Sequence, residues 1–346
     1  MGRLSFVGLG LGSRGIGVDG VAAIRDSDLF LLEYYTVPHD TRLVPELVEI
    51  TGRSPTIVDR GTVEDGEFIL GEASAKRVVL AVLGDPMVAT THTELRVRAI
   101  KAGIETRVFH AASIASAAAS ASGLHYYKFG STMTVTRETV DHLDRVYRAV
   151  QRNLLGGEHT LLLLEHDVES GEGVDPGMAV RGLLQAETDL KRGVFSKESF
   201  GLVISRLGNE DASFKAGAFG SIERLDFGGP PYCVIVPGTL HFTESEAISA
   251  IFSVPQWEVK GNTEEVKRTA QVLLPKYLAK TRRALEQVRG KVGNEYAPVI
   301  ENAELYAKDA ENFLSKGDDD LAMLSIGYAE GLLDSLNFSG IVKIDW

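Results

Sequence analysis

At residues 83–92 the chain reads LGDPMVATTH, a turn between an apolar run and a helix-like segment. The run at 78–83 predicts a strand, and residues 92–103 space their apolar side chains along one helical face before a terminal glycine. A loop beyond the carboxyl end of a buried strand is where open α/β sheets bind their ligands. Asp85 could accept hydrogen bonds from an amine or a hydroxyl, although an Asp in such a turn can equally well only cap the next helix.

The same pattern of an apolar run followed by a helix-like segment continues on both sides of this loop. From about residue 4 to residue 242, short apolar runs alternate with helix-like segments, which is typical of an α/β fold with mostly buried, parallel strands. The predicted strands are residues 4–7, 29–33, 78–83, 105–109, 132–135, 160–164, 202–205 and 232–236. Residues 111–122, nearly all Ala and Ser, predict a thin helix that lets a ligand approach closely, and tight helix packing explains this composition equally well.

The sequence pattern changes after residue 257, where the short apolar runs end. Two long, charged stretches at 263–289 and 298–339 predict helices, and the second is expected to break at 316–318, where Gly317 can end one helix and Asp318 can cap the next. Charges of both signs are mixed along these helices, which is typical of solvated faces. We therefore predict a separate helical domain.

A second glycine loop, FVGLGLGSRG at residues 6–15, follows the first predicted strand. It satisfies the GxGxxG pattern through Gly10, Gly12 and Gly15, and Glu33 ends the next strand where a dinucleotide-binding fold places its ribose-binding acid. Further glycines delay the helix to about Asp19 and leave it roughly two turns long, whereas a dinucleotide site needs the helix to begin within the glycines. An NAD-binding oxidoreductase stays open as an alternative.

Composition excludes several classes of function. The net charge of −12 and a pI near 5.2 disfavour general binding to nucleic acid. The one cysteine, Cys233, lies in an apolar run and predicts a buried thiol. We find neither a signal-peptide pattern nor an apolar run of about 20 residues, and therefore expect a soluble, cytoplasmic protein with no membrane span. The histidines lack metal-ligand spacing, and hydrolase-elbow and Walker motifs are absent from the sequence.

Several segments, in the same order and spacing, resemble the diphthine synthase family. They are VGLGL at 7–11, GDPMVATTH at 84–92, HAASI at 110–114, GLHYYKFG at 123–130, HTLLLL at 159–164, DFGGPP at 226–231 and VPGTLH at 236–241. The Gly-Asp-Pro loop alone indicates the wider class of tetrapyrrole-methylase-like enzymes, whereas the ATTH extension and the LHYYKFG block are similar to diphthine synthases in particular. The resemblance extends over residues 1 to about 255.

The resemblance implies two α/β domains, at 1–112 and 113–257, with S-adenosylmethionine in the cleft between them, and usually a homodimer. Residues 261–346 are similar to a small archaeal helical domain of unknown function. Residue by residue, the implied cofactor contacts are Leu11, Asp85, Val88, Ser113, Ile114, Leu164, Leu207 and His241. These are mostly apolar residues or backbone groups, which suits an adenine ring. We assign no catalytic base, although His92, His110, His125 and Asp85 are candidates for the pocket.

The activity that the resemblance implies is S-adenosylmethionine-dependent methylation of translation elongation factor 2. Three successive transfers to the amine of its modified histidine would give diphthine, a step of diphthamide biosynthesis. Two further alternatives are a related methylase acting on a tetrapyrrole and a non-catalytic binding protein that docks a partner through its helical tail. We expect no metal and no direct contact with nucleic acid.

Overall fold

The computed structural model describes residues 2–35, 42–168 and 170–346. They separate into two compact units, one comprising 1–190 and 194–264 and the other comprising 191–193 and 265–346. The helical region expected at the C-terminus is confirmed by the second unit, whereas the domain boundaries expected near residues 112 and 257–261 stay predictions. Among the described residues, no helix is long and apolar enough to cross a membrane.

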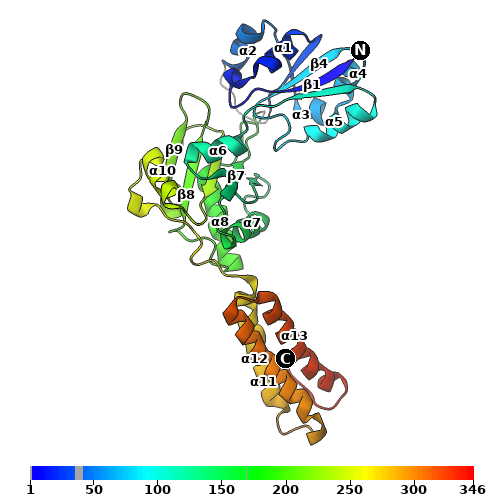
Figure 1. The fold of residues 1–346 in the computed structure, drawn as a ribbon, viewed down its shortest axis with the longest axis vertical. Helices are drawn as coiled ribbons and strands as arrows, with labels where there is room; N and C mark the ends of the chain where they lie inside the picture. The colour runs from blue at the N-terminus through cyan, green and yellow to red at the C-terminus, as the bar shows by residue number, and fades with distance from the viewer. Residues whose placement is uncertain (1, 36–41, 169) are drawn as a thin grey trace. The chain divides into compact units, whose positions relative to one another are not determined.

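The first sheet of the larger unit is parallel throughout, with strand order β3-β2-β4-β1-β5 (Figure 1). Its strands are β1 (Arg3–Gly8), β2 (Leu29–Glu33), β3 (Thr56–Val58), β4 (Arg77–Val82) and β5 (Glu105–Phe109). Its helices are α1 (Val18–Arg25), α2 (Leu43–Thr51), α3 (Arg60–Asp65), α4 (Glu67–Ala75) and α5 (His92–Lys101). The prediction matched four of these strands within a residue or so, and it missed β3, a short edge strand with two exposed residues.

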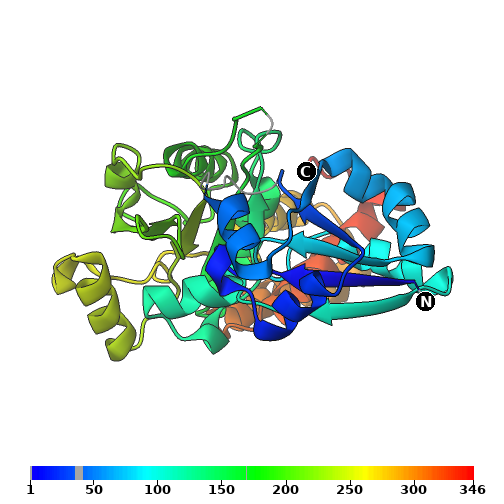
Figure 2. The ribbon, with the colours of Figure 1, turned by 90° about the horizontal axis from the view of Figure 1, so that it is seen from above.

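Helices cover both faces of this sheet. Figure 2, in which the molecule is seen from above, shows the sheet with its helices. Along β4, Val78 and Leu80 pack with the core under α3, α4 and α5, whereas Val79 and Ala81 pack with the core under α1 and α2. Because both faces are buried, residues 78–82 of β4 are all apolar, and this is why the run is continuous rather than alternating. The parallel arrangement brings the carboxyl ends of β4, β1 and β5 to one edge of the sheet.

The second sheet has strand order β6-β7-β10-β8-β9, and three of its strands, β7, β8 and β9, are labelled in Figure 1. It comprises β6 (Met133–Val135), β7 (Thr160–Leu164), β8 (Phe200–Ser205), β9 (Ser213–Ala218) and β10 (Tyr232–Val236). Only the β6–β7 pair is parallel; the other three pairs are antiparallel, so the expectation of mostly parallel strands is wrong for this sheet. The prediction also missed β9, because its sequence SFKAGA has small residues and a lysine in place of an apolar run.

Helices again cover both faces of the second sheet. They are α6 (Ile114–Ser122), α7 (Asp144–Leu155), α8 (Pro176–Leu190), α9 (Phe219–Ile222) and α10 (Phe242–Phe252). Ala118 of α6 and Ile248 of α10 share one core with Leu202 and Cys233, whereas α7, α8 and α9 contact the strands from the other side. Cys233 is a buried thiol, as predicted, and burial raises its pKa to about 12.

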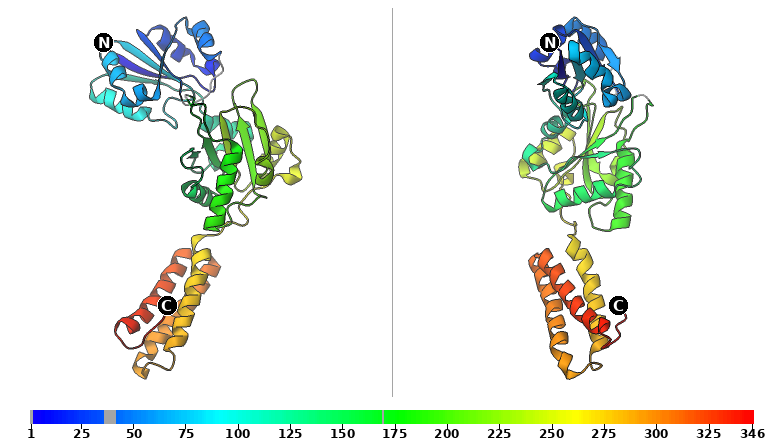
Figure 3. Two further views of the ribbon diagram at one scale, coloured as in Figure 1. Left: turned by 180° about the vertical axis from the view of Figure 1, so that it is seen from behind. Right: turned by 90° about the vertical axis from the view of Figure 1, so that its right-hand side faces the viewer.

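The smaller unit is a bundle of α11 (Thr269–Val288), α12 (Ala297–Lys316) and α13 (Asp319–Phe338). α12 and α13 form an antiparallel hairpin and α11 packs against it (Figure 3). The helix break expected at 316–318 is confirmed, with Gly317 in the left-handed region at φ 86°. Asp318 precedes α13, but its side chain makes no capping hydrogen bond, so the capping role expected for it is wrong.

Candidate functional site

Three loops meet at the carboxyl edge of the first sheet. The loop after β1 is joined to the loop after β4, because Gly10 and Gly84 exchange backbone hydrogen bonds of 3.2 and 2.7 Å. A side chain at Gly8 would meet Ala111 and Gly84 at 2.8 Å, so the segment after β5 also packs against this junction. Glycine is required at both Gly8, for this close approach, and Gly10, whose φ is 70°.

Asp85 lies at the centre of these loops with only 7% of its side chain exposed. One carboxylate oxygen accepts a hydrogen bond from the backbone N–H of Met87 at 2.9 Å, and the other accepts from Nδ1 of His110 at 2.8 Å and from the N–H of Ala111 at 3.2 Å. Burial alone would raise the pKa of Asp85, but these three donors outweigh it and hold that pKa below its usual value. Asp85 is therefore an ionised group that fixes the loop after β4 to the segment after β5.

His110 differs from Asp85 in its exposure, because 71% of its side chain is open to solvent. Its Nδ1 donates to Asp85, so in the neutral imidazole the lone pair lies on Nε2. An imidazole held in this tautomer by a carboxylate can accept a proton at Nε2. The pair Asp85–His110 thus presents a base at the edge of the sheet.

A second histidine, His92, lies beneath the loop and is 1% exposed. Its Nδ1 donates to the carbonyl of Pro86 at 2.9 Å, and its Nε2 lies 2.6 Å from the Glu33 carboxylate. Burial lowers the pKa of His92, but the hydrogen bond and the charge of Glu33 raise that pKa by more than burial lowers it. The net result is a pKa above the usual value. The acid that a dinucleotide site would use for ribose is therefore engaged inside the fold, which disfavours the NAD alternative.

The junction of the two sheets brings together most of the predicted cofactor residues. Leu11 approaches Gly208, the neighbour of Leu207, closely enough that a Cβ on Gly208 would lie 2.4 Å from the Leu11 Cβ. Ile114 and Leu207 pack on one core of the second sheet, and Ser113 precedes Ile114 at the start of α6. Asp85 and Val88 belong to the loop after β4, and Leu164 ends β7 at the same end of the second sheet as Ser205 of β8.

His241 is the one predicted residue that lies apart from this group. It begins α10, and its ring lies 5.7 Å from that of His125, which follows the far end of α6. Ser113 and Ile114 lie at the opposite end of α6, whose nine residues make it roughly 13 Å long. The structure therefore does not join His241 to the loops around Asp85.

His241 instead adjoins a group of hydrogen bonds centred on the buried Glu244, which we call the Glu244 node and which the sequence analysis did not predict. Glu244, with no exposed side-chain area, accepts hydrogen bonds from Lys128 Nζ at 2.5 Å, from the His125 and His241 N–H groups at 2.8 Å, and from His159 Nε2 at 3.0 Å. Burial raises the pKa of Glu244, yet these donors lower it to about 2. His159 accepts the Gly238 N–H at Nδ1, and its burial lowers its pKa, so this histidine is neutral.

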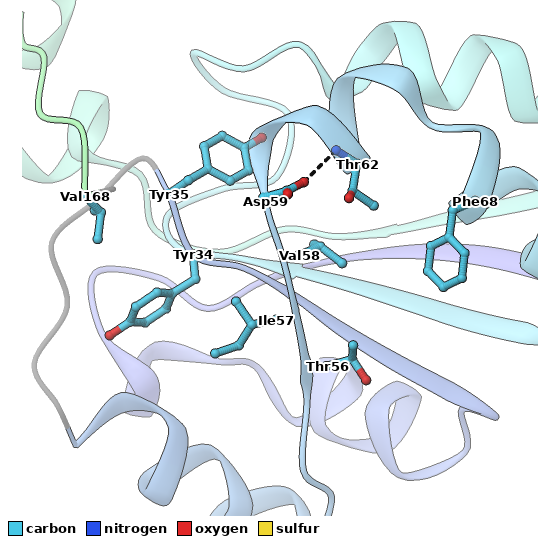
Figure 4. Close-up of a pocket in the computed structure, with 9 residues that line it drawn as sticks. All are labelled: Tyr34, Tyr35, Thr56, Ile57, Val58, Asp59, Thr62, Phe68 and Val168. Carbon is cyan, nitrogen blue, oxygen red and sulfur yellow. Dashed lines mark hydrogen bonds between the residues drawn. The ribbon is translucent and has the colours of Figure 1, made fainter. Parts of the chain in front are cut away.

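A cavity of about 550 Å³ opens at the carboxyl ends of β2 and β3 (Figure 4). It is lined by Tyr34, Tyr35, Thr56, Ile57, Val58, Asp59, Thr62, Phe68 and Val168. Val168 comes from the segment after β7, and its N–H donates to the carbonyl of Tyr35 at 3.4 Å. The cavity shares its sheet edge with the loops around Asp85, but none of the eight predicted cofactor residues lines it.

The residues at the junction fit an adenosine-containing cofactor. A Cβ at Gly84 would meet nothing within 4 Å, and one at Gly12 would meet only the Gly208 carbonyl at 4.0 Å, so the backbone of both loops is open to a ligand. Leu11, Ile114 and Leu207 supply apolar surface beside it. Among the described residues, no group of three or more His, Cys, Asp or Glu side chains is arranged to hold a metal ion.

Comparison with known protein families matches residues 3–222 to tetrapyrrole (corrin/porphyrin) methylases. Residues 276–342 match a family described as a protein of unknown function, DUF357. Diphthine synthase of Methanothermobacter thermautotrophicus is 35% identical over 255 residues, covering 73% of this chain and 97% of that protein. Diphthine synthase of Methanocella arvoryzae is 36% identical over 249 residues, covering 71% of this chain and 96% of that protein.

A solved structure of a diphthine synthase also matches. Its TM-score is 0.65 at 31% identity, and the match covers 76% of this chain and all of that chain. Each of these relatives is matched over nearly its whole length, but about a quarter of the present chain has no counterpart in them.

Proposed function

This chain belongs to the diphthine synthase family of tetrapyrrole methylases, and from that premise we propose that it methylates the amine of the modified histidine of translation elongation factor 2. The methyl donor we propose is S-adenosylmethionine, and the acceptor is the 3-amino-3-carboxypropyl group of that histidine. Three successive transfers give diphthine. The acceptor is a translation factor, so we place the enzyme in the cytoplasm.

The observation that supports this proposal best is the convergence of three loops at one sheet edge, with Asp85 holding His110. In the proposed site Leu11, Ile114, Leu164 and Leu207 provide apolar walls, and the loop backbones provide polar contacts. When bound, S-adenosylmethionine supplies an activated methyl group. We infer no cofactor contact for His241, because α6 separates it from the other residues.

The residues of the chain also account for the proton that each transfer releases. An amine attacks through its lone pair and must therefore be unprotonated, and after each transfer the resulting ammonium must lose a proton before the next. We propose that His110 Nε2 accepts this proton and, being exposed, passes it to water. Asp85 acts as a positioning residue that fixes the tautomer of His110.

Mass spectrometry tests the function directly. Elongation factor 2 carrying the aminocarboxypropyl-histidine is incubated with this protein and S-adenosylmethionine, and the modified peptide is analysed. We expect mass gains equal to added methyl groups, up to three, with no gain when the histidine is unmodified. No gain despite calorimetric binding of S-adenosylmethionine would reject this acceptor and favour a methylase of another substrate, such as a tetrapyrrole.

The homodimer implied by the family is likewise a proposal. Sedimentation of the chain at several concentrations tests it.

A further inference from the structure

The helix α13 has two different faces. Ala322, Ile326, Ala329 and Leu333 are buried in the cores of the helical bundle. The opposite face is exposed and still carries large apolar side chains, with Leu321 46%, Leu324 54%, Tyr328 56% and Phe338 82% exposed. Tyr306 of α12 stacks on Tyr328, with ring centroids 5.5 Å apart, and extends this apolar surface.

The spacing of the exposed face is that of a coiled-coil seam. Its members are Leu321, Leu324, Tyr328, Gly331, Ser335 and Phe338, which alternate intervals of three and four residues. Apolar or small residues at these intervals form the line along which two helices supercoil. All six are uncharged, in a chain in which 24% of residues are charged. A merely solvated helix face would be expected to carry charges.

Two glycines in the middle of this face point to the same conclusion. Gly327 and Gly331 are helix-interior residues, where glycine lowers helix stability relative to alanine. A Cβ at either position would meet nothing within 4 Å, so packing inside the chain does not require glycine at either position. Glycines of this kind allow another helix to approach the backbone closely.

We propose that the seam on α13 is an interface between two copies of this chain, in which the two α13 helices pair antiparallel. The seam matches itself about a midpoint between Ala329 and Glu330. In an antiparallel pair, Leu321 lies opposite Phe338 of the second copy, Leu324 opposite Ser335, and Tyr328 opposite Gly331. A large side chain thus meets a small one at the two inner positions, and two large apolar side chains meet at each end.

A second copy fits this seam better than a different partner. A two-fold interface requires one surface to complement itself, and the matching intervals and sizes meet this requirement. The chain carries a net charge of −12, so its copies repel each other wherever acidic faces meet, and an uncharged seam avoids that repulsion. One helix pair, with Tyr306 at its side, is a small interface, so we expect dissociation on dilution.

Sedimentation velocity of the full chain over a range of concentrations tests the interface. Leu324→Glu is expected to weaken self-association, so that dissociation to the monomer begins at a higher concentration than for the unsubstituted chain, whether or not the methylase unit also associates. The control is Ala279→Glu, which adds the same charge at an exposed position of α11 and should leave the mass unchanged. The same concentration dependence for the unsubstituted chain and Leu324→Glu would overturn the proposal, including the case in which another protein covers the seam.

The glycines provide a second, independent measurement. Gly331→Ala should raise the melting temperature of the dissociated chain by a few degrees, because alanine favours the helix. The same substitution should weaken association by about tenfold or more, because the new methyl group meets Tyr328 of the second copy. Higher thermal stability with unchanged association would show that the glycines serve no interface. Methyl transfer tests neither result, so this proposal stands or fails apart from the proposed function.

Discussion

Asp85 and Glu244 are both carboxylates that are withdrawn from solvent and held by several hydrogen-bond donors, and in both the donors lower the pKa against the effect of burial. Their surroundings differ. Glu244 joins the segment at 125–128, His159 and the start of α10, and its side chain is wholly buried. Asp85 instead holds His110, most of which faces solvent. A buried, hydrogen-bonded carboxylate therefore fixes the fold at Glu244, whereas at Asp85 it orients an exposed imidazole.

The largest expected effect is on the free energy of unfolding, at Glu244, whose carboxylate has only a structural role. Glu244→Ala removes the acceptor of four donors, and it leaves the buried His159 and the partly buried Lys128 ammonium without their partner. Breaking a buried ion pair in this way costs about 3–5 kcal/mol of unfolding free energy. Urea denaturation measures the loss. The control Glu246→Ala, at an exposed position of the same helix, should change stability by less than about 0.5 kcal/mol, and equal losses in both variants would contradict the role given to Glu244.

The contribution of Glu244 to stability should also be lost in acid. The pKa of Glu244 is about 2 in the folded chain against an ordinary 4.5, so its contribution to stability is present above about pH 4.5 and is lost as the pH falls toward 2. The shift corresponds to roughly 3 kcal/mol. We expect the stability of Glu244→Gln to fall less steeply than that of the unsubstituted chain across this range, as measured by urea denaturation at each pH. Parallel curves would mean that the carboxylate is not held as described.

At the other carboxylate the effect should fall on turnover rather than on folding. His110→Ala is expected to lower kcat by about 10²-fold, or roughly 2.7 kcal/mol, because a positioned base contributes at least this much to proton transfer. The melting temperature and the affinity for S-adenosylmethionine should change little, since the ring is exposed. The control is His142→Ala, another exposed histidine. If both variants kept full activity, the acceptor amine would be losing its proton without His110.

The difference between the two carboxylates also explains what the sequence could predict. The strands β1, β2 and β4 were predictable because burial on both faces makes each one a largely apolar run, whereas β5, at the sheet edge, is apolar only at Val108 and Phe109. The Gly-Asp-Pro loop follows β4 directly, so Asp85 could be placed at the carboxyl edge of the sheet without knowledge of distant contacts.

The Glu244 node was not predictable in the same way. Glu244 and its donor His125 are 119 residues apart, and only the packing of α10 beside the segment after α6 brings them together. The sequence did contain one local signal, a capping box in which Glu244 lies three residues after His241. The antiparallel pairing of the second sheet was missed for a related reason, since apolar runs show that strands exist but not in which direction they pair.

A third carboxylate sharpens the comparison, because it makes the same kind of bond in full contact with water. Asp59 is exposed, precedes α3 and accepts the Thr62 N–H at 2.8 Å; the Thr62 side chain first, and then this backbone bond, lower the pKa of Asp59. Since water can replace the lost acceptor, Asp59→Ala should lower the stability far less than Glu244→Ala does.

Two further variants separate the cap from the charge. Asp59→Ser keeps an acceptor oxygen at the start of α3 and should recover most of the loss, whereas Asp65→Ala, at the last residue of that helix, should be neutral or slightly stabilising because a negative charge there opposes the helix dipole. Urea denaturation distinguishes these cases. If Asp59→Ala cost as much as Glu244→Ala, neither burial nor the number of donors would set the strength of these interactions, and the contrast between Asp85 and Glu244 would need a different cause.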